Sequence, residues 1–222
     1  MIDIFGVSIY EASIALTDLI LFLESGIFAV LLARRVGNAP LFQKLSIGVF
    51  LFLAASSLTG AVFHAFFPLK VGTSGGLSMW IVAIGSIGFL ASTLWALIVL
   101  MLLGQKGVRM ILPLVGLFLG AYFYTITFVD YQYLTVIFFY APPVVLLGVL
   151  SAHRFIKSGE RGWGLLGIGV GLSILAALIQ VLRISIDPTY LSFNTLYHLV
   201  QAIALFFLYR GFALLGRKHV LN

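Results

Sequence analysis

The sequence predicts an all-α membrane protein, and its composition and the length of its apolar runs carry that prediction. Hydrophobic residues make up 62% of the 222 residues and charged residues only 9%, whereas soluble domains contain about 25% charged residues. The apolar residues form runs of about 20, the length needed to cross a hydrocarbon core about 30 Å thick. We therefore expect one polytopic helical domain over residues 1–222.

Seven apolar segments follow one another along the chain, separated by short connections that are mostly turn-like. Their limits are 11–33, 43–67, 78–103, 109–129, 132–154, 163–184 and 190–214. The opening stretch MIDIFGVSIYEAS lacks the basic region of a cleavable signal, so we expect the first segment to be a retained span. The sequence thus predicts seven transmembrane helices.

Basic residues are concentrated on one side of the predicted bundle. The odd-numbered connections and the C-terminal end carry Arg34, Arg35, Lys44, Lys106, Arg109, Arg154, Lys157, Arg161, Arg217 and Lys218. The opposite side carries Lys70 and Arg183. The positive-inside rule makes the C-terminus cytoplasmic and the N-terminus external. We expect an integral membrane protein, in the cytoplasmic (inner) membrane if the chain is bacterial.

The charge and the lack of cysteine exclude several kinds of function. The net charge of +6 comes from short connections between spans, so we expect no nucleic-acid partner. The sequence contains no cysteine, which excludes disulfides, thiol catalysis and thiolate-bound metals.

Ionisable residues inside predicted spans are costly and are candidates for function by default. Five are present: Asp18, Glu24, His64, Arg183 and His198. The predicted orientation places Asp18 about 10 Å from the outer surface, at 1.5 Å per residue. All but Glu24, which lies nearer the midplane, share the outer half of the membrane.

Helical periodicity places further polar residues beside the two histidines. Asn194, His198 and Gln201 lie on one face of the seventh span, and Ser57 shares a face of the second span with His64. We expect an outward-opening polar pocket between spans one, two, six and seven. The alternative is a purely structural cluster, since intramembrane hydrogen bonds average under about 1 kcal/mol.

These features together resemble the CREST superfamily, which includes alkaline ceramidases and progestin/adiponectin-type receptors. The shared features are seven spans, an outward N-terminus, serine and histidine in the second span, and a histidine in the seventh. Characterised hydrolases of that superfamily hold zinc with one second-span histidine and a His-xxx-His pair of the last span, assisted by a serine and an aspartate. The resemblance implies a metal-dependent hydrolase of lipid amides or esters.

This sequence departs from the superfamily pattern at three places. Asn194 stands where the His-xxx-His pair would begin, so the motif reads Asn-xxx-His. Gly60 stands where the assisting serine would lie, and Ser57, one turn away, is the remaining candidate for that role. The third span contains no aspartate.

With these departures, the resemblance implies a zinc site of two histidines and one carboxylate. His64 and His198 would be ligands and Asp18 the third ligand or a base, because two histidines and a carboxylate with an open water position form a catalytic zinc set. Such an ion would activate water for attack on an amide or ester. Asn194 or Arg183 would stabilise the oxyanion.

Three other functions are compatible with the same residues. A non-enzymatic subunit of a larger membrane complex, or a receptor-like binder, fits the short connections. His64 and His198 lie at similar depth and could ligate haem. Asp18 and Glu24 could serve a proton-coupled transporter. The expected partners are a membrane lipid or other amphiphile and, for a subunit, other membrane proteins.

Overall fold

The computed structural model describes residues 2–4, 6–34, 41–188 and 190–221, with side chains at 6, 8–34, 41–188 and 190–216. These residues form α1 (Ala12–Ala33), α2 (Leu41–Phe66), α3 (Ser74–Phe128), α4 (Tyr133–Ser158), α5 (Arg161–Val181) and α6 (Phe193–Leu221). A short antiparallel hairpin of β1 (Ile2–Ile4) and β2 (Val7–Ile9) precedes α1, and a 3₁₀ turn, η1 (Lys70–Gly72), follows α2. The predicted all-α class is confirmed.

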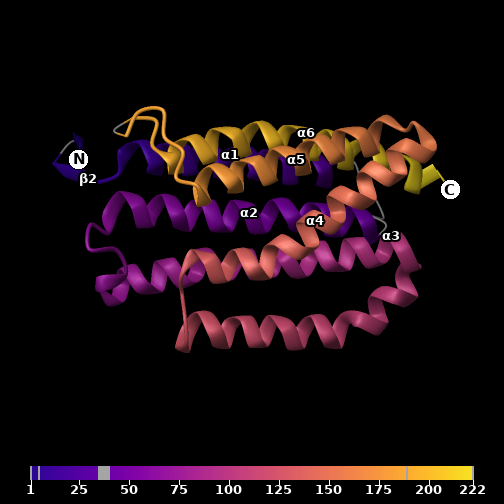
Figure 1. The fold of residues 1–222 in the computed structure, drawn as a ribbon, viewed down its shortest axis with the longest axis horizontal. Helices are drawn as coiled ribbons and strands as arrows, with labels where there is room; N and C mark the ends of the chain where they lie inside the picture. Colours follow the sequence, from indigo (N-terminus) through magenta and orange to yellow (C-terminus); the bar gives the residue numbers. More distant parts are fainter. Residues whose placement is uncertain (1, 5, 35–40, 189, 222) are drawn as a thin grey trace.

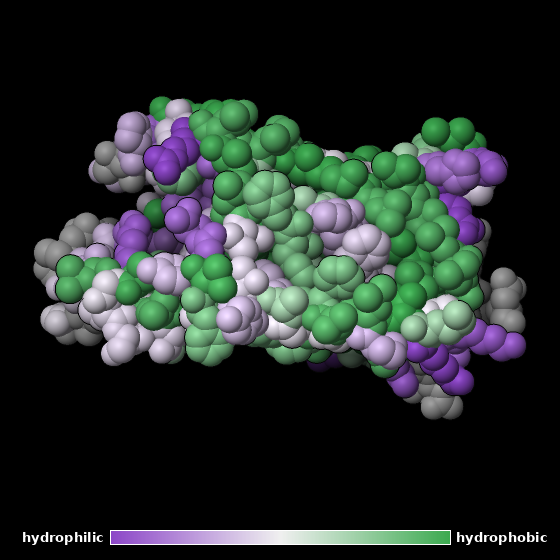
Figure 2. Space-filling model, turned by 60° about the horizontal axis from the view of Figure 1, so that its bottom comes forward, coloured by the Kyte–Doolittle hydropathy of each residue, from purple (hydrophilic) through white to green (hydrophobic). Residues whose placement is uncertain are grey.

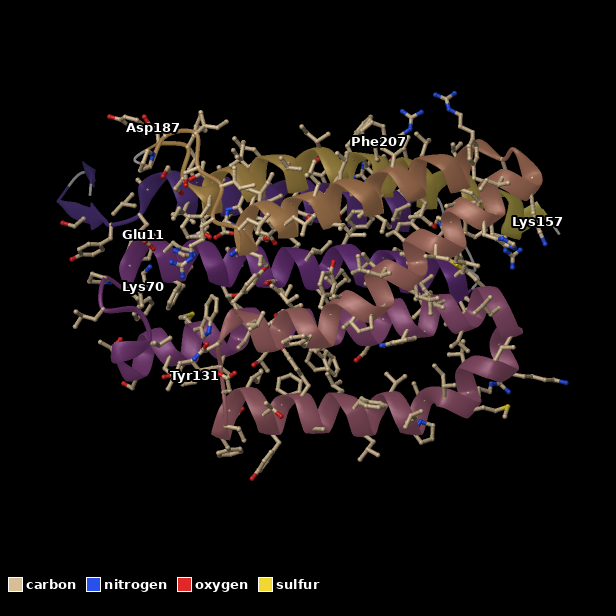
Figure 3. The ribbon with its side chains drawn as sticks, in the orientation of Figure 1. Glu11, Lys70, Tyr131, Lys157, Asp187 and Phe207 are labelled. Carbon is tan, nitrogen blue, oxygen red and sulfur yellow. The ribbon has the colours of Figure 1, made fainter. Side chains whose placement is uncertain are left out.

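The helices lie side by side along one axis (Figure 1). Each of the six in the described part of the chain is long and apolar enough to cross a membrane. Figure 2 shows an apolar surface between two ends where hydrophilic side chains gather. Lys157 lies at one end of the bundle and Glu11, Lys70 and Asp187 at the other (Figure 3). Of the basic residues that predict the orientation, Arg35 lies outside the described residues, as do the side chains of Arg217 and Lys218.

The longest helix, α3, reverses direction at Gly104. Its 55 residues would extend about 80 Å if straight, far more than a bilayer is thick. Gly104 has φ 70° and ψ −169°, a conformation open essentially to glycine alone. The two arms then pack against each other, with the Tyr122 hydroxyl donating to the Ile84 carbonyl at 2.8 Å. The arms correspond to the predicted segments 78–103 and 109–129.

The main core is made by α1, α2, the first arm of α3, α4, α5 and α6. Phe50, Leu97, Leu166 and Phe212 are essentially inaccessible. A β-carbon at Gly211 would lie 2.8 Å from the Leu166 backbone nitrogen, so α5 and α6 approach each other closely. This tight packing fixes α6, which carries His198, against the rest of the bundle.

The fourth helix crosses the bundle obliquely, from α3 towards α5 (Figure 1). Near the α4–α5 connection the two helices are in contact, with the Gly148 and Gly164 backbones close to the Val170 and Phe155 side chains. Farther from the connection they diverge, and side chains of both helices line a cavity instead. Pro142 and Pro143 lie within α4, between the cavity-lining residues Ala141 and Val144.

Candidate functional site

A cavity of about 640 Å³ lies inside the end of the bundle that carries the N-terminus. Its wall is formed by α1, α2, α4, α5 and α6 with the beginning of α3. Lys70 and Tyr131 lie at its outer end, and Leu21, Leu53 and Leu205 line its deep end. Figure 2 shows the surface hollowed between hydrophilic side chains at this end. The volume is within the range of about 300–1,000 Å³ of ligand-binding pockets.

The structure brings most of the predicted site residues to this one cavity. Asp18, Ser57, His64, Asn194 and His198 all line it. They come from α1, α2 and α6, which are three of the four helices predicted to form the pocket, and Gln180 represents the fourth, α5. The residues chosen from the sequence by their depth in the predicted spans and by their helical face therefore line one cavity.

The centre of the site is a buried contact between Asp18 of α1 and His198 of α6. Asp18 Oδ1 lies 3.4 Å from His198 Nε2, and the two residues are only 5% and 8% exposed. The other ring nitrogen, Nδ1, lies 2.9 Å from Thr17 Oγ1. Both ring nitrogens of His198 are thus engaged by consecutive residues of α1.

The hydroxyl of Thr17 favours one arrangement of protons at this contact. Thr17 Oγ1 can donate its hydrogen to the Ile14 carbonyl at 2.9 Å and accept one from Nδ1 of His198. Nε2 then faces Asp18 with a single proton for the two groups to share. A carboxyl–imidazole pair of this kind can take up and release a proton, which is the requirement for general acid–base chemistry.

Gly60 of α2 makes room for the Asp18 carboxyl. A β-carbon at Gly60 would lie 2.9 Å from Asp18 Oδ2, closer than non-bonded atoms approach. Any side chain at this position competes with the carboxyl for the same space. The buried Asp18 carboxyl therefore requires a glycine at this position of α2.

A second carboxyl–histidine contact lies nearer the outer end of the cavity. His64 Nδ1 is 2.6 Å from Glu11 Oε2, and Lys70 Nζ is 3.0 Å from Glu11 Oε1. Glu11 directly precedes α1, and its backbone nitrogen donates to the His64 carbonyl at 3.2 Å. The hydrogen bond with His64, aided by Lys70, lowers the Glu11 pKa to about 2, although partial burial opposes the shift. Glu11 is therefore ionised at neutral pH.

Tyrosines of α4 and α6 belong to the site although sequence reasoning did not select them. Tyr133, Tyr140 and Tyr197 all line the cavity. The hydroxyls of Tyr133 and Tyr197 hydrogen-bond to each other. The spacing of seven residues between Tyr133 and Tyr140 on one helix was the available signal. Whether these two tyrosines face a cavity depends on the oblique path of α4, and helical periodicity does not predict that path.

Two predicted residues lie apart from the cavity wall described here. Arg183 follows the end of α5, has a left-handed backbone (φ 52°), and extends over the Phe193 ring, 6.0 Å from its centroid. Arg183 lies beyond the end of α5, and the Asp18 carboxyl lies against His198. Glu24 is half-buried on α1, six residues after Asp18.

Asn194 and Gln201 are held by neighbours on α5. Gln180 Nε2 donates to Asn194 Oδ1 at 3.2 Å, and Gln201 Nε2 donates to Ser173 Oγ at 3.1 Å. Since its oxygen accepts from Gln180, the Asn194 amide keeps its N–H groups for a molecule in the cavity. The oxyanion role of Asn194 stays a prediction.

The side chains as they lie do not form the predicted three-ligand zinc set. In the described part of the chain, no three His, Cys, Asp or Glu residues gather around a common point. His198 uses both ring nitrogens and His64 uses Nδ1 in the contacts above. A zinc ion would have to replace Asp18 or Thr17 at His198, so the zinc site stays a prediction.

Comparison with known proteins gives a family without an assigned activity. Residues 13–217 match the model of a family described as of unknown function, DUF6962. No curated protein and no solved structure matches the chain.

We predict that Gly60→Ala separates Asp18 from His198. The added methyl overlaps the carboxyl, so the free energy of unfolding in detergent should fall by about 1–3 kcal/mol, as for other overpacked cores. In an Asp18→Ala background the same substitution should cost much less, because the competing group is gone.

Gly26→Ala is the matched control for this cycle, since nothing lies within 4 Å of the added carbon. An equal cost of Gly60→Ala with and without Asp18 would show that the glycine serves helix packing alone.

Proposed function

The chain belongs to the DUF6962 family, and we propose that it is a seven-span membrane protein that binds an amphiphile, such as a membrane lipid, in the cavity around Asp18 and His198. Seven spans follow if each arm of α3 crosses the membrane, and an odd number places the two termini on opposite sides. Lys106 and Arg109 of the α3 turn and Arg154, Lys157 and Arg161 of the α4–α5 connection favour a cytoplasmic location for that end.

The distribution of polar and apolar side chains in the cavity is the observation that carries the proposal. Polar groups line its outer and middle parts, and Leu21, Leu53 and Leu205 line the deep end. Val145 of α4 and Leu178 of α5 line the side where these helices diverge, and both are about half exposed. In a bilayer this side faces lipid, so an amphiphile can enter without crossing water.

Acid–base chemistry on the bound amphiphile is the second part of the proposal, and the buried Asp18–His198 pair favours it. In hydrolysis of an ester or amide, water would add to the carbonyl carbon while its proton passes to the pair. The pair would then return that proton to the leaving alkoxide or amine. Asn194 would donate to the oxyanion, and Ser57 lines the same cavity.

Measurements on the purified protein distinguish the proposed function from the alternatives. Metal analysis of the purified protein tests the zinc hydrolase, and a visible spectrum tests haem on His64 and His198. Stoichiometric membrane proteins that co-purify would favour the subunit function. Proton-coupled transport would require Glu24, which lies outside the cavity wall as described.

We predict that the α5–α6 connection is external and the α4–α5 connection cytoplasmic. The sequence has no cysteine, so single-cysteine variants can be labelled without background. A membrane-impermeant thiol reagent should label Tyr190→Cys on intact cells and Lys157→Cys only after permeabilisation. The reverse pattern would invert the orientation, and equal labelling would contradict a membrane crossing by α5.

We predict that filling the cavity from α5 displaces the bound amphiphile. Ala177 lines the cavity, whereas Leu175 on the same helix is 47% exposed and does not. Lipids extracted from purified Ala177→Trp should contain several-fold less of any species that mass spectrometry finds bound to wild type. Leu175→Trp should retain it. Equal retention by both variants would place the bound species on the outer surface.

We predict that any amide or ester hydrolysis depends on His198. His198→Ala should reduce the turnover of acyl substrates about 100-fold or more, the usual contribution of a general base. The control is His153→Ala, an exposed residue near the opposite end of α4. If the two variants hydrolyse equally, the Asp18–His198 pair is not catalytic, and the cavity serves binding alone.

A further inference from the structure

The charges at the outer end of the cavity are arranged with the cation facing inward. Lys70 and His64 both line the cavity, and their common partner Glu11 does not. Glu11 accepts from both groups, at 3.0 Å from Lys70 Nζ and 2.6 Å from His64 Nδ1. The Glu11 carboxylate therefore forms ion pairs with two basic residues of the cavity wall without lining the cavity itself. A molecule at the outer end of the cavity can contact Lys70, whereas Glu11 does not line the cavity.

Lys70 is held at this position by a costly backbone conformation. Its φ is 49°, and Lys70 and Arg183 are the two residues other than glycine with a positive φ in the described part of the chain. The turn is closed by the Lys70 amide, which donates to the Phe67 carbonyl at 2.9 Å. The side chain is 49% exposed, so an ammonium with three donors has capacity beyond Glu11. Left-handed backbone is unfavourable for an L-residue, and it tends to occur at ligand sites.

The depth of the cavity matches the hydrocarbon of one leaflet. From His64 at the outer end to Leu53 at the deep end is 11 residues of α2, or about 16 Å at 1.5 Å per residue. Half of a hydrocarbon core about 30 Å thick is about 15 Å. An acyl chain can therefore lie in the apolar part while its head group reaches Lys70.

The position of Asp18 restricts where a negative charge can lie. Gly60, which contacts the Asp18 carboxyl, is one helical turn deeper than His64 on α2. An anionic group at that depth would meet a second acidic group in an apolar setting, which is costly. At the outer end it would meet Lys70. An uncharged amide or ester linkage can occupy the level of Asp18 and His198.

We propose that Lys70 selects acyl amphiphiles with an anionic head group, carboxylate or phosphate, and holds that group at the outer end of the cavity. This inference rests on the proposed amphiphile-binding function and names the class of ligand. Lys70 acts as a specificity residue, whereas Asp18 and His198 contact the linkage below it.

Two probes that differ only in head-group charge test this inference. N-palmitoylglycine carries a carboxylate, and N-palmitoylethanolamine has the same amide and acyl chain with a neutral hydroxyl. Binding of each would be measured on the full chain in nanodiscs of zwitterionic phosphatidylcholine, with mass spectrometry confirming that the amide is intact. Wild type should bind the glycine conjugate about tenfold more tightly, as expected for a hydrogen bond between charged groups.

Three variants separate head-group recognition from folding. Lys70→Gln should lose the preference while its affinity for the neutral conjugate stays within about twofold, which also shows that the cavity is intact. Lys70→Arg should keep the preference because it keeps the charge. Arg183→Gln is the control for general surface charge and should also keep it, since Arg183 lies off the cavity wall.

The outcomes distinguish this inference from the function on which it rests. Equal affinities of wild type for the two conjugates, or a preference that survives in Lys70→Gln, would overturn head-group selection and leave amphiphile binding standing. Failure of wild type to bind either conjugate would count against the amphiphile site itself.

Discussion

The cost of burying the Asp18 carboxyl determines how this end of the bundle is built. A carboxyl in an apolar interior is tolerated only with hydrogen-bonding partners, and three helices contribute to its environment. His198 of α6 lies against one oxygen, Thr17 of α1 fixes the imidazole, and Gly60 of α2 leaves space for the other oxygen. A change at any of these positions alters the same contact, so the site and the packing of α1, α2 and α6 cannot vary independently.

The cavity exists because one helix does not run parallel to its neighbours. Reversal of α3 at Gly104 brings the chain back to the outer end before α4 begins, and α4 then crosses towards α5. Near their connection α4 and α5 are in contact, and this contact closes the deep end of the cavity. Where they diverge, Tyr133 and Tyr140 of α4 line the cavity together with Asn194 and His198 of α6. A bundle of strictly parallel helices would fill this space with side chains.

The sequence was sufficient to predict the helical segments and the residues of α1, α2 and α6 that share the cavity. Apolar run length defines the segments, and depth combined with helical face places Asp18, His64 and His198 together. The pairing inside the cavity was not predictable, because it depends on where α5 ends and on helix rotation at the level of single side chains. Asp18 therefore meets His198, whereas Arg183 lies beyond the helix. The α4 tyrosines were not predicted for a related reason: the angle at which α4 crosses the bundle produces no periodic pattern in the sequence.

Two chemistries compete for the same histidine, and the geometry makes them mutually exclusive. As a base, His198 needs Asp18 beside Nε2 and Thr17 beside Nδ1, as they lie. As a zinc ligand it must give up one of these partners and approach His64, whose Nδ1 is engaged by Glu11. Asn194, four residues before His198, has an amide side chain, which is a weaker zinc ligand than an imidazole. A zinc site there would lack a strong ligand, whereas the contact of Asp18 with His198 and the space that Gly60 leaves for the carboxyl need no metal.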